Sequence, residues 1–305
     1  MSAAIETTGL VRRFGRTDAV NGLTMTVPEG SVFALIGPNG AGKTTTIKLL
    51  MNLLRPSGGM ARVLGADVRR LGPAELRRIG YVSENQRLPD WMTPAQLLRY
   101  CRAFYPSWDA ALERRLQASL GLTQNARLRS LSRGTRMKVA LLASLAYRPE
   151  LVVLDEPFTG LDPVVRDELI RALLDASGDR RWTVLISSHD VDEVERLADW
   201  IAFLDAGRLR FAEPTASLLA RFRRVEVVSD DPGLASRAAA HPRWIVEGIA
   251  GRTLRFVDTA HDEPDAARGV AATFPGADIR IASMPLREIF IALAGPTPPG
   301  VQEVV

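Results

Sequence analysis

The segment GPNGAGKTT, residues 37–45, constrains the fold more than any other stretch of this 305-residue chain. It follows the apolar run SVFALI and leads into the helical pattern TIKLLMNLL. Its spacing fits G-x-x-x-x-G-K-[ST] in the strand–loop–helix setting that this motif requires. Glycines let the backbone curl, so successive N–H groups can point inward and hold an anion at a helix N-terminus. The sequence therefore predicts a phosphate-binding loop made of Gly37, Pro38, Asn39, Gly40, Ala41, Gly42, Lys43, Thr44 and Thr45.

Residues 1–220 alternate short β-branched runs with helical patterns, as expected of an α/β domain built on a largely parallel sheet. The runs include SVFALIG (31–37), IGYVS (79–83), LVVLDE (151–156) and TVLISSH (183–189). Ligands of such sheets bind at the carboxyl ends of the strands. The side chains that follow these runs are therefore the candidate site.

Two acidic residues end the run LVVLDE, and their order predicts two roles. Asp155 is expected to share Mg²⁺ with the hydroxyl of Thr44, while Lys43 reaches the outer phosphates. Glu156 points the other way and is a candidate to polarise an attacking water. The hydroxyl of a protein or sugar acceptor stays open as the nucleophile, although the acidic doublet favours water.

The chain changes character near residue 222, where the net charge turns from positive to negative. The pattern of residues 223–295 reads strand, helix, strand, strand, helix, strand, followed by the helix PLREIFIALAG. This order predicts a small α+β accessory domain of the ferredoxin-like kind. Residues 296–305 are expected to be a tail.

Composition bears on compartment and partners. No apolar run approaches the ~18 residues that cross a bilayer, and the N-terminus lacks the apolar core of a secretory signal. Cys101 is the only cysteine, which suits a reducing cytoplasm. The net charge of +4 comes from scattered arginine pairs with acids between them, so no nucleic acid partner is expected.

Four further motifs occur in a fixed order and carry a family resemblance. LSRGT (131–135) places Ser132 as the N-cap of a patterned helix, with Gly134 in its first turn. GLDP contains Asp162, SSHDVDEVERLAD contains His189, and LVRRFGRTDAV contains Phe14. Together with the phosphate loop and the acidic strand, residues 5–220 resemble the nucleotide-binding subunits of ABC transporters.

The resemblance implies an α/β fold of the P-loop NTPase type, with a RecA-like core in residues 1–222 and a helical subdomain at about 85–148. It also implies a function, in which two ATPase domains dimerise head to tail and enclose ATP and Mg²⁺ between the phosphate loop of one and the signature segment of the other. The whole layout is similar to ATPase subunits of ABC-2 exporters. The partners would be an identical or related ATPase subunit and a separate membrane permease, at the inner face of the cell membrane. A soluble ABC ATPase and a nucleotide-dependent regulatory module are the alternatives.

The resemblance also assigns individual roles. Glu156 and His189 would be catalytic, and Thr44, Asp155 and Glu84 would face the metal. The other nucleotide contacts would come from Phe14 stacking on adenine, from Asp162, and from Ser132 and Gly134 across the dimer interface.

Three motifs depart from the family pattern. The signature segment has Arg133 and Thr135 where glycine and glutamine are common. Glu84 occupies the usual place of a glutamine, with Gln86 two residues later. Phe14 replaces a more frequent tyrosine.

The stretch 90–108 is rich in aromatic residues, and we expect most of them to form the core of the helical subdomain. Trp91 and Met92 are the candidates for contact with a permease.

Overall fold

The computed structural model describes residues 2–122, 126–177, 182–262 and 265–294. Its contacts separate the chain into two compact units, with the division between Ala212 and Glu213. This division is earlier than the boundary at 222 that the change in composition indicates. The reason is that Arg221 pairs with Glu213 and donates a hydrogen bond to the carbonyl of Thr259, so the segment 213–222 belongs to the second unit.

The strands of the first unit are β1 (Ala3–Phe14), β2 (Thr17–Pro28), β3 (Val32–Ile36), β4 (Gly58–Val63), β5 (Ala66–Asp67), β6 (Ile79–Ser83), β7 (Leu151–Asp155), β8 (Thr183–Ser188), β9 (Trp200–Asp205) and β10 (Arg208–Pro214), the last of which crosses the division. Its helices are α1 (Lys43–Leu50), α2 (Pro73–Leu76), α3 (Pro94–Arg102), α4 (Ala110–Ser119), α5 (Arg133–Leu145) and α6 (Pro163–Ser177).

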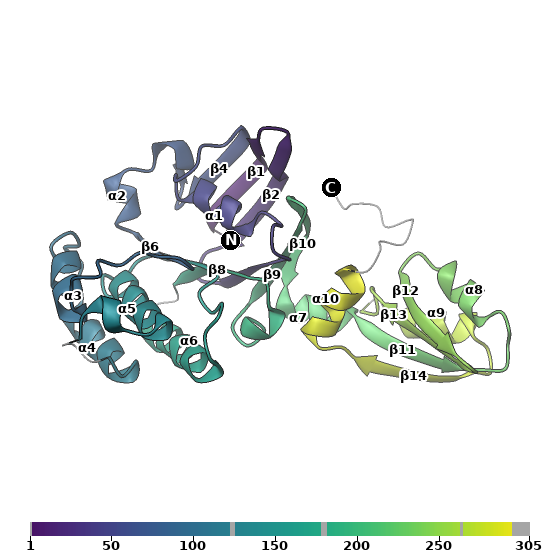
Figure 1. Ribbon diagram of the computed structural model, residues 1–305. Helices are drawn as coiled ribbons and strands as arrows, with labels where there is room; N and C mark the ends of the chain where they lie inside the picture. Colours follow the sequence, from purple (N-terminus) through teal and green to yellow (C-terminus); the bar gives the residue numbers. More distant parts are fainter. Residues whose placement is uncertain (1, 123–125, 178–181, 263–264, 295–305) are drawn as a thin grey trace. The chain divides into compact units, whose positions relative to one another are not determined.

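These strands form two sheets (Figure 1). One has the order β2-β1-β4-β5, and the other has the order β10-β9-β3-β8-β7-β6 with β9, β3, β8, β7 and β6 parallel. Every residue of β7 is buried, as in parallel sheets covered on both faces. Helix α1 contributes to one apolar core with strands of both sheets. Because Ser187 pairs in register with both Leu35 and Asp155, the carboxyl ends of three neighbouring strands lie at one edge.

Helices α3, α4 and α5 form the helical segment, and each starts at a side-chain cap: Thr93, Asp109 and Ser132 accept hydrogen bonds from their first-turn amides. Met92, Leu97, Leu128 and Val139 form its small apolar core. The aromatic stretch is less buried than expected.

Trp91 is 68% exposed, and Tyr100 and Phe104, predicted as core, are also exposed and contact each other edge to face at 5.0 Å. Helix α3 buries the face with Leu97 and Leu98 instead, which leaves Tyr100 on its other side, and Phe104 lies in the turn after the helix ends. Met92 is buried, which excludes it as a surface contact.

The second unit contains α7 (Thr215–Arg221), β11 (Arg223–Val228), α8 (Leu234–Ala239), β12 (Trp244–Ala250), β13 (Thr253–Asp258), α9 (Ala266–Thr273), β14 (Asp278–Ser283) and α10 (Leu286–Ala294). Its sheet has the order β12-β13-β11-β14 with antiparallel neighbours. This is the arrangement of a ferredoxin-like βαββαβ unit, so the predicted α+β fold is confirmed. Trp244, Phe256 and Phe274 stack at the centre of its core.

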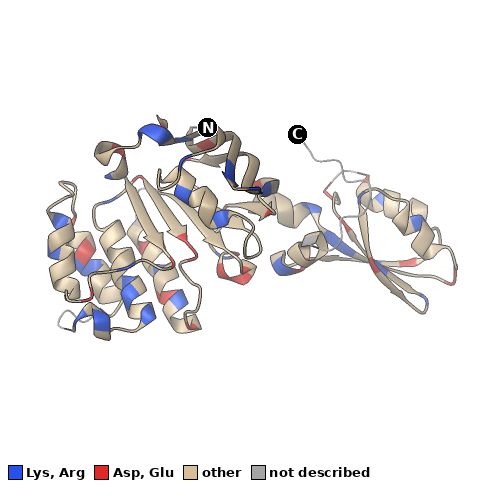
Figure 2. Ribbon diagram, turned by 45° about the horizontal axis from the view of Figure 1, so that its top comes forward, with Lys and Arg blue, Asp and Glu red and all other residues tan. Residues whose placement is uncertain are grey.

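Basic and acidic residues are interspersed along the ribbon of each unit (Figure 2). Among the helices that the structure describes, none has both the length and the apolar character needed to cross a membrane.

Candidate active site

The predicted phosphate loop connects β3 to α1, and glycine is required at both of its ends. A Cβ atom at Gly37 would lie 2.0 Å from the carbonyl oxygen of Leu204. Gly42 has a φ of 104°, and a Cβ there would lie 2.3 Å from the carbonyl oxygen of Ala19. Gly42 is the N-cap of α1 without a side-chain cap, so no side chain competes for the first amides of that helix.

Lys43, the first residue of α1, is buried inside the loop. Its Nζ donates hydrogen bonds to the carbonyls of Gly37 at 2.7 Å and Pro38 at 3.1 Å, and lies 3.1 Å from Oε1 of Glu156. The lysine and the glutamate therefore compensate each other's charge at a place where neither could be buried alone.

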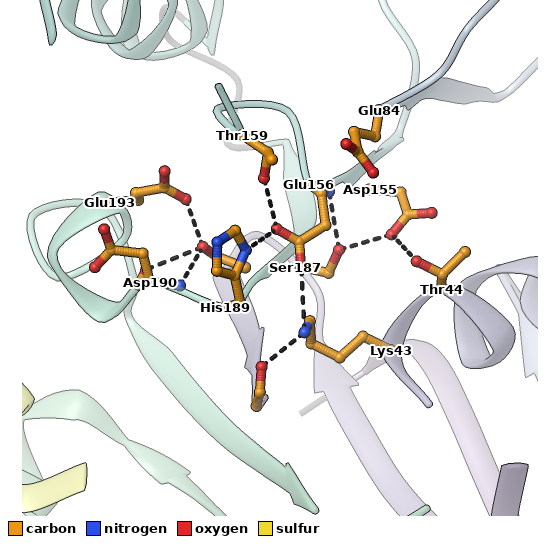
Figure 3. Close-up of polar contacts among 12 residues, drawn as sticks. Lys43, Thr44, Glu84, Asp155, Glu156, Thr159, Ser187, His189, Asp190 and Glu193 are labelled. Atoms are coloured by element: carbon orange, nitrogen blue, oxygen red, sulfur yellow. Dashed lines mark hydrogen bonds and ion pairs between the residues drawn. The ribbon is translucent and has the colours of Figure 1, made fainter. Parts of the chain in front are cut away.

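Glu156 follows β7 in the left-handed region, with a φ of 51°. The other carboxylate oxygen, Oε2, accepts a hydrogen bond from Thr159 Oγ1 at 2.9 Å and contacts His189 Nδ1 at 2.7 Å (Figure 3). Burial opposes ionisation, but the hydrogen bond with His189 and the charge of Lys43 outweigh it and lower the pKa of Glu156. Glu156 is consequently ionised at neutral pH, the form that can accept a proton.

Asp155 lies behind the loop and is held by two hydroxyls. Thr44 Oγ1 and Ser187 Oγ donate to its Oδ1 at 2.9 and 2.8 Å, and the amide of Glu156 donates to Ser187 Oγ at 3.0 Å. Burial raises the pKa of Asp155 in spite of these bonds. Ser187 was missed by the sequence reasoning, as was Thr159. The position of Ser187, two residues before His189 at the end of a neighbouring parallel strand, is the signal that could have found it.

The loop that carries His189 is fixed by a third buried acid, Glu193. Ser188 Oγ donates to Oε2 of Glu193 at 2.5 Å, and Arg166 Nη2 lies 3.3 Å from Oε1 of the same carboxyl group. Burial raises the pKa of Glu193. Because Arg166 belongs to α6, this cluster connects the histidine loop to the helix that follows Asp162.

A pocket joins several of the predicted residues on one surface. Its lining consists of Ala19, Asn39, Gly40, Ala41, Gly42, Lys43, Thr44, Thr45, Glu84, Glu156, Thr159 and His189. Figure 3 shows His189 and Thr159 on one side of Glu156 and Glu84 on the side of Asp155. The phosphate loop, the candidate base and the histidine therefore face one space.

The remaining predicted residues lie outside that lining. Ser132 caps α5 by accepting a hydrogen bond from the amide of Thr135, and Gly134 packs against Val165. Asp162 caps α6. The Phe14 ring is 45% exposed and lies beneath the guanidinium of Arg12, 4.4 Å from its centroid.

Comparisons with known proteins agree with this arrangement. Residues 20–159 match the family model described as ABC transporter. The daunorubicin/doxorubicin resistance ATP-binding protein DrrA of Streptomyces peucetius is 41% identical over 224 residues, which are 71% of this chain and 66% of that protein. The Nod factor export ATP-binding protein I of Burkholderia lata is 34% identical over 308 residues, which are 96% of this chain and 97% of that protein. A solved ATP-binding subunit of an ABC transporter has a TM-score of 0.64 at 26% identity, over 70% of this chain and 91% of that one.

The similarity thus extends over nearly the full length of a relative, and it includes the sheet that carries both the phosphate loop and the acidic end of β7. Like those relatives, the chain belongs to the ATP-binding proteins of ABC transporters and is an ABC ATPase.

Proposed function

We propose that this chain hydrolyses Mg-ATP at a head-to-tail dimer interface to drive an export permease. One observation carries the proposal: the contact of Glu156 with both Lys43 of the phosphate loop and His189. Two relatives whose names refer to drug resistance and Nod factor export align along almost their whole length, which supports export as the process.

The loop geometry supports a phosphate-binding step in which Lys43 exchanges one partner, the Glu156 carboxylate, for another, the phosphates of ATP. When the outer phosphates of ATP enter the loop, Lys43 Nζ turns from the Glu156 carboxylate to the phosphate oxygens. Glu156 is then free to accept a proton from water, and its remaining contact with His189 keeps the carboxylate aimed at the pocket. Because Lys43 and Glu156 are buried as a pair, Glu156 becomes available as a base only when nucleotide binding draws Lys43 away.

The residues at the loop also fit Mg²⁺. Thr44 Oγ1 and Asp155 Oδ1 are hard oxygen donors 2.9 Å apart, and Mg²⁺ in nucleotide sites usually takes one or two carboxylates, with phosphates and water as the other ligands. No cluster of three or more acidic, histidine or cysteine ligands occurs in the described residues, and this mode of binding does not need one. When bound, the ion would supply positive charge to the phosphates.

A second chain, identical or related, completes the site in this proposal. Ser132 and Gly134 lie at the N-terminus of α5, outside the pocket of their own chain. Amides at such an N-terminus suit an anion, here the γ-phosphate bound by the partner. Asp162 would act at the same interface, and the exposed Phe14 ring would stack on adenine.

The permease contact in this proposal is made by exposed aromatic residues: Trp91, just before α3, and the contacting pair Tyr100 and Phe104. Large exposed aromatic groups are enriched at protein interfaces. The ATPase would then be cytoplasmic and would lie at the inner face of the cell membrane through its permease.

Glu156→Gln tests the proposal. The variant should bind ATP, lose hydrolysis and form an ATP-dependent dimer on size-exclusion chromatography, because the amide keeps the shape but accepts no proton. A Glu156→Gln chain that hydrolyses ATP at the wild-type rate would show that Glu156 is not the base. A regulatory module without turnover would show no ATPase activity in the wild-type chain.

A further inference from the structure

Two of the positions that depart from the family pattern, Glu84 and Arg133, contact each other. Nη2 of Arg133 lies 3.2 Å from Oε1 of Glu84. Glu84 follows β6, and Arg133 is the first residue of α5. Where the pattern commonly has two neutral residues, glutamine and glycine, this chain has a pair of opposite charges. The two departures are therefore one structural feature.

The pair connects two parts of the proposed composite site. Glu84 lines the nucleotide pocket together with Lys43 and Thr44. Arg133 follows Ser132, the cap of the helix that would meet the nucleotide of the partner. Its guanidinium also packs beside Gly160, where an added Cβ would lie 3.0 Å from Nη1. Arg133 thus fills the space between the pocket wall and the turn before Asp162.

The exposure of the pair indicates what kind of effect it has. The Arg133 and Glu84 side chains are 48% and 35% exposed, and exposed pairs change an equilibrium constant by at most about fivefold. Global stability is therefore a minor part of its effect. The main effect of the pair is to keep the Glu84 side chain in place. Without a cation beside it, the Glu84 carboxylate would be repelled by Asp155, by Glu156 and by the phosphates of a nucleotide.

We infer that Arg133 is a positioning residue that holds the Glu84 carboxylate at the pocket wall, and that this contact links one chain's nucleotide pocket to its own signature segment. The inference rests on the proposed head-to-tail dimer. When nucleotide binding moves Glu84, Arg133 passes the movement to the start of α5. Nucleotide in a chain's own pocket therefore affects how the signature segment of that chain contacts the nucleotide of its partner.

A double-mutant cycle tests the inference with Glu84→Gln, Arg133→Gln and the double variant. Arg78→Gln is the matched control, since Arg78 forms a similarly exposed pair with Glu150 at 2.7 Å, away from the pocket lining. Two quantities are measured: kcat and KM for ATP, and, in a Glu156→Gln background, the ATP concentration that gives half-maximal dimer. Urea midpoints show that each variant is folded.

Arg133→Gln should lower kcat about three- to fivefold when residue 84 is glutamate. When residue 84 is glutamine, the same substitution should lower kcat by less than about twofold. In both backgrounds kcat should change more than KM. The ATP requirement for dimerisation should rise by the same factors. Arg133→Lys, which keeps a cation, should retain more activity than Arg133→Gln, and Arg78→Gln should behave as wild type.

Equal losses with glutamate and glutamine at position 84 would overturn the inference, and this is the result expected if Arg133 acts directly on the nucleotide of the partner. An equal effect of Arg78→Gln would overturn it too. Failure of the proposed function would look different. The wild-type chain would then lack ATP turnover and the Glu156→Gln chain would stay monomeric with ATP, and these results would overturn the proposed function and the inference together. Failure of the inference alone leaves those two properties intact.

Discussion

Replacing Ser187 by alanine should destabilise the first unit strongly, although Ser187 is fully buried and does not itself line the pocket. Its hydroxyl is fully buried, donates to the Asp155 carboxylate at 2.8 Å and accepts from the Glu156 amide at 3.0 Å. Loss of a hydrogen bond to a charged group costs about 1.5–3 kcal/mol, and a buried amide left unsatisfied costs about 1–3 kcal/mol. A loss of about 3 kcal/mol is therefore a low estimate for the free energy of unfolding.

Urea unfolding of the nucleotide-free protein measures this loss. With a denaturant slope of about 3 kcal/mol per molar, Ser187→Ala should lower the unfolding midpoint by about 1 M. Because the Ser187 hydrogen bond lowers the pKa of Asp155, its removal should also move the acid limb of the ATPase pH profile to higher pH.

Thr46→Val is the matched control. Thr46 is also fully buried on the adjoining helix, but among the described residues its hydroxyl has no hydrogen-bond partner. Exchange of that hydroxyl for a methyl group should change stability by less than about 1 kcal/mol. Equal midpoints for Ser187→Ala and wild type, or an equal loss in Thr46→Val, would refute the hydrogen-bond argument.

Three further perturbations have definite expected results. Lys43→Ala should abolish ATP binding in a titration. It should also destabilise the nucleotide-free chain by about 3 kcal/mol, because it leaves the Glu156 carboxylate buried without its cation. Lys48→Ala, on the exposed face of the same helix, should do neither. The pKa of Glu156 is lowered from an unfolded value near 4.5, so the ionised carboxylate stabilises the folded state above that pH. This stabilisation is lost as the pH falls through the lower pKa of the folded state. Thermal melts of wild type and Glu156→Gln should therefore converge below pH 4.5, and a difference that stays constant with pH would contradict this. Gly37→Ala should yield no folded protein, since its Cβ would lie 2.0 Å from a backbone oxygen, whereas Gly40→Ala has open space and should cost about 1 kcal/mol from its positive φ alone.

Local patterns predicted the parts of the site that local geometry determines. The spacing of Gly37, Gly42 and Lys43 specifies a loop conformation by itself, and the apolar run before Asp155 specifies a buried strand. The position of Ser132 before a patterned helix was likewise enough to predict its capping role, which the structure confirms.

Contacts that depend on how distant segments pair were not predictable in this way. Ser187 reaches Asp155 only because β7 and β8 are parallel neighbours in that register. The contact of Arg133 with Glu84 depends on where α5 packs against the end of β6. The exposure of Tyr100 depends on which face of α3 is buried, and that face is chosen by the tertiary structure.

The left-handed backbone at Glu156 has a consequence for the evolution of the chain. Glycine or asparagine would suit a φ of 51° better than glutamate, by roughly 1 kcal/mol. Selection for thermal tolerance alone would gain from these residues only where Lys43 is also replaced, because otherwise the buried lysine loses its anion at a cost of about 3 kcal/mol. In a library randomised at codons 43 and 156 and sorted for heat tolerance, the two positions should therefore change together. Selection for ATP turnover should retain both residues, so the two positions are expected to evolve as a unit.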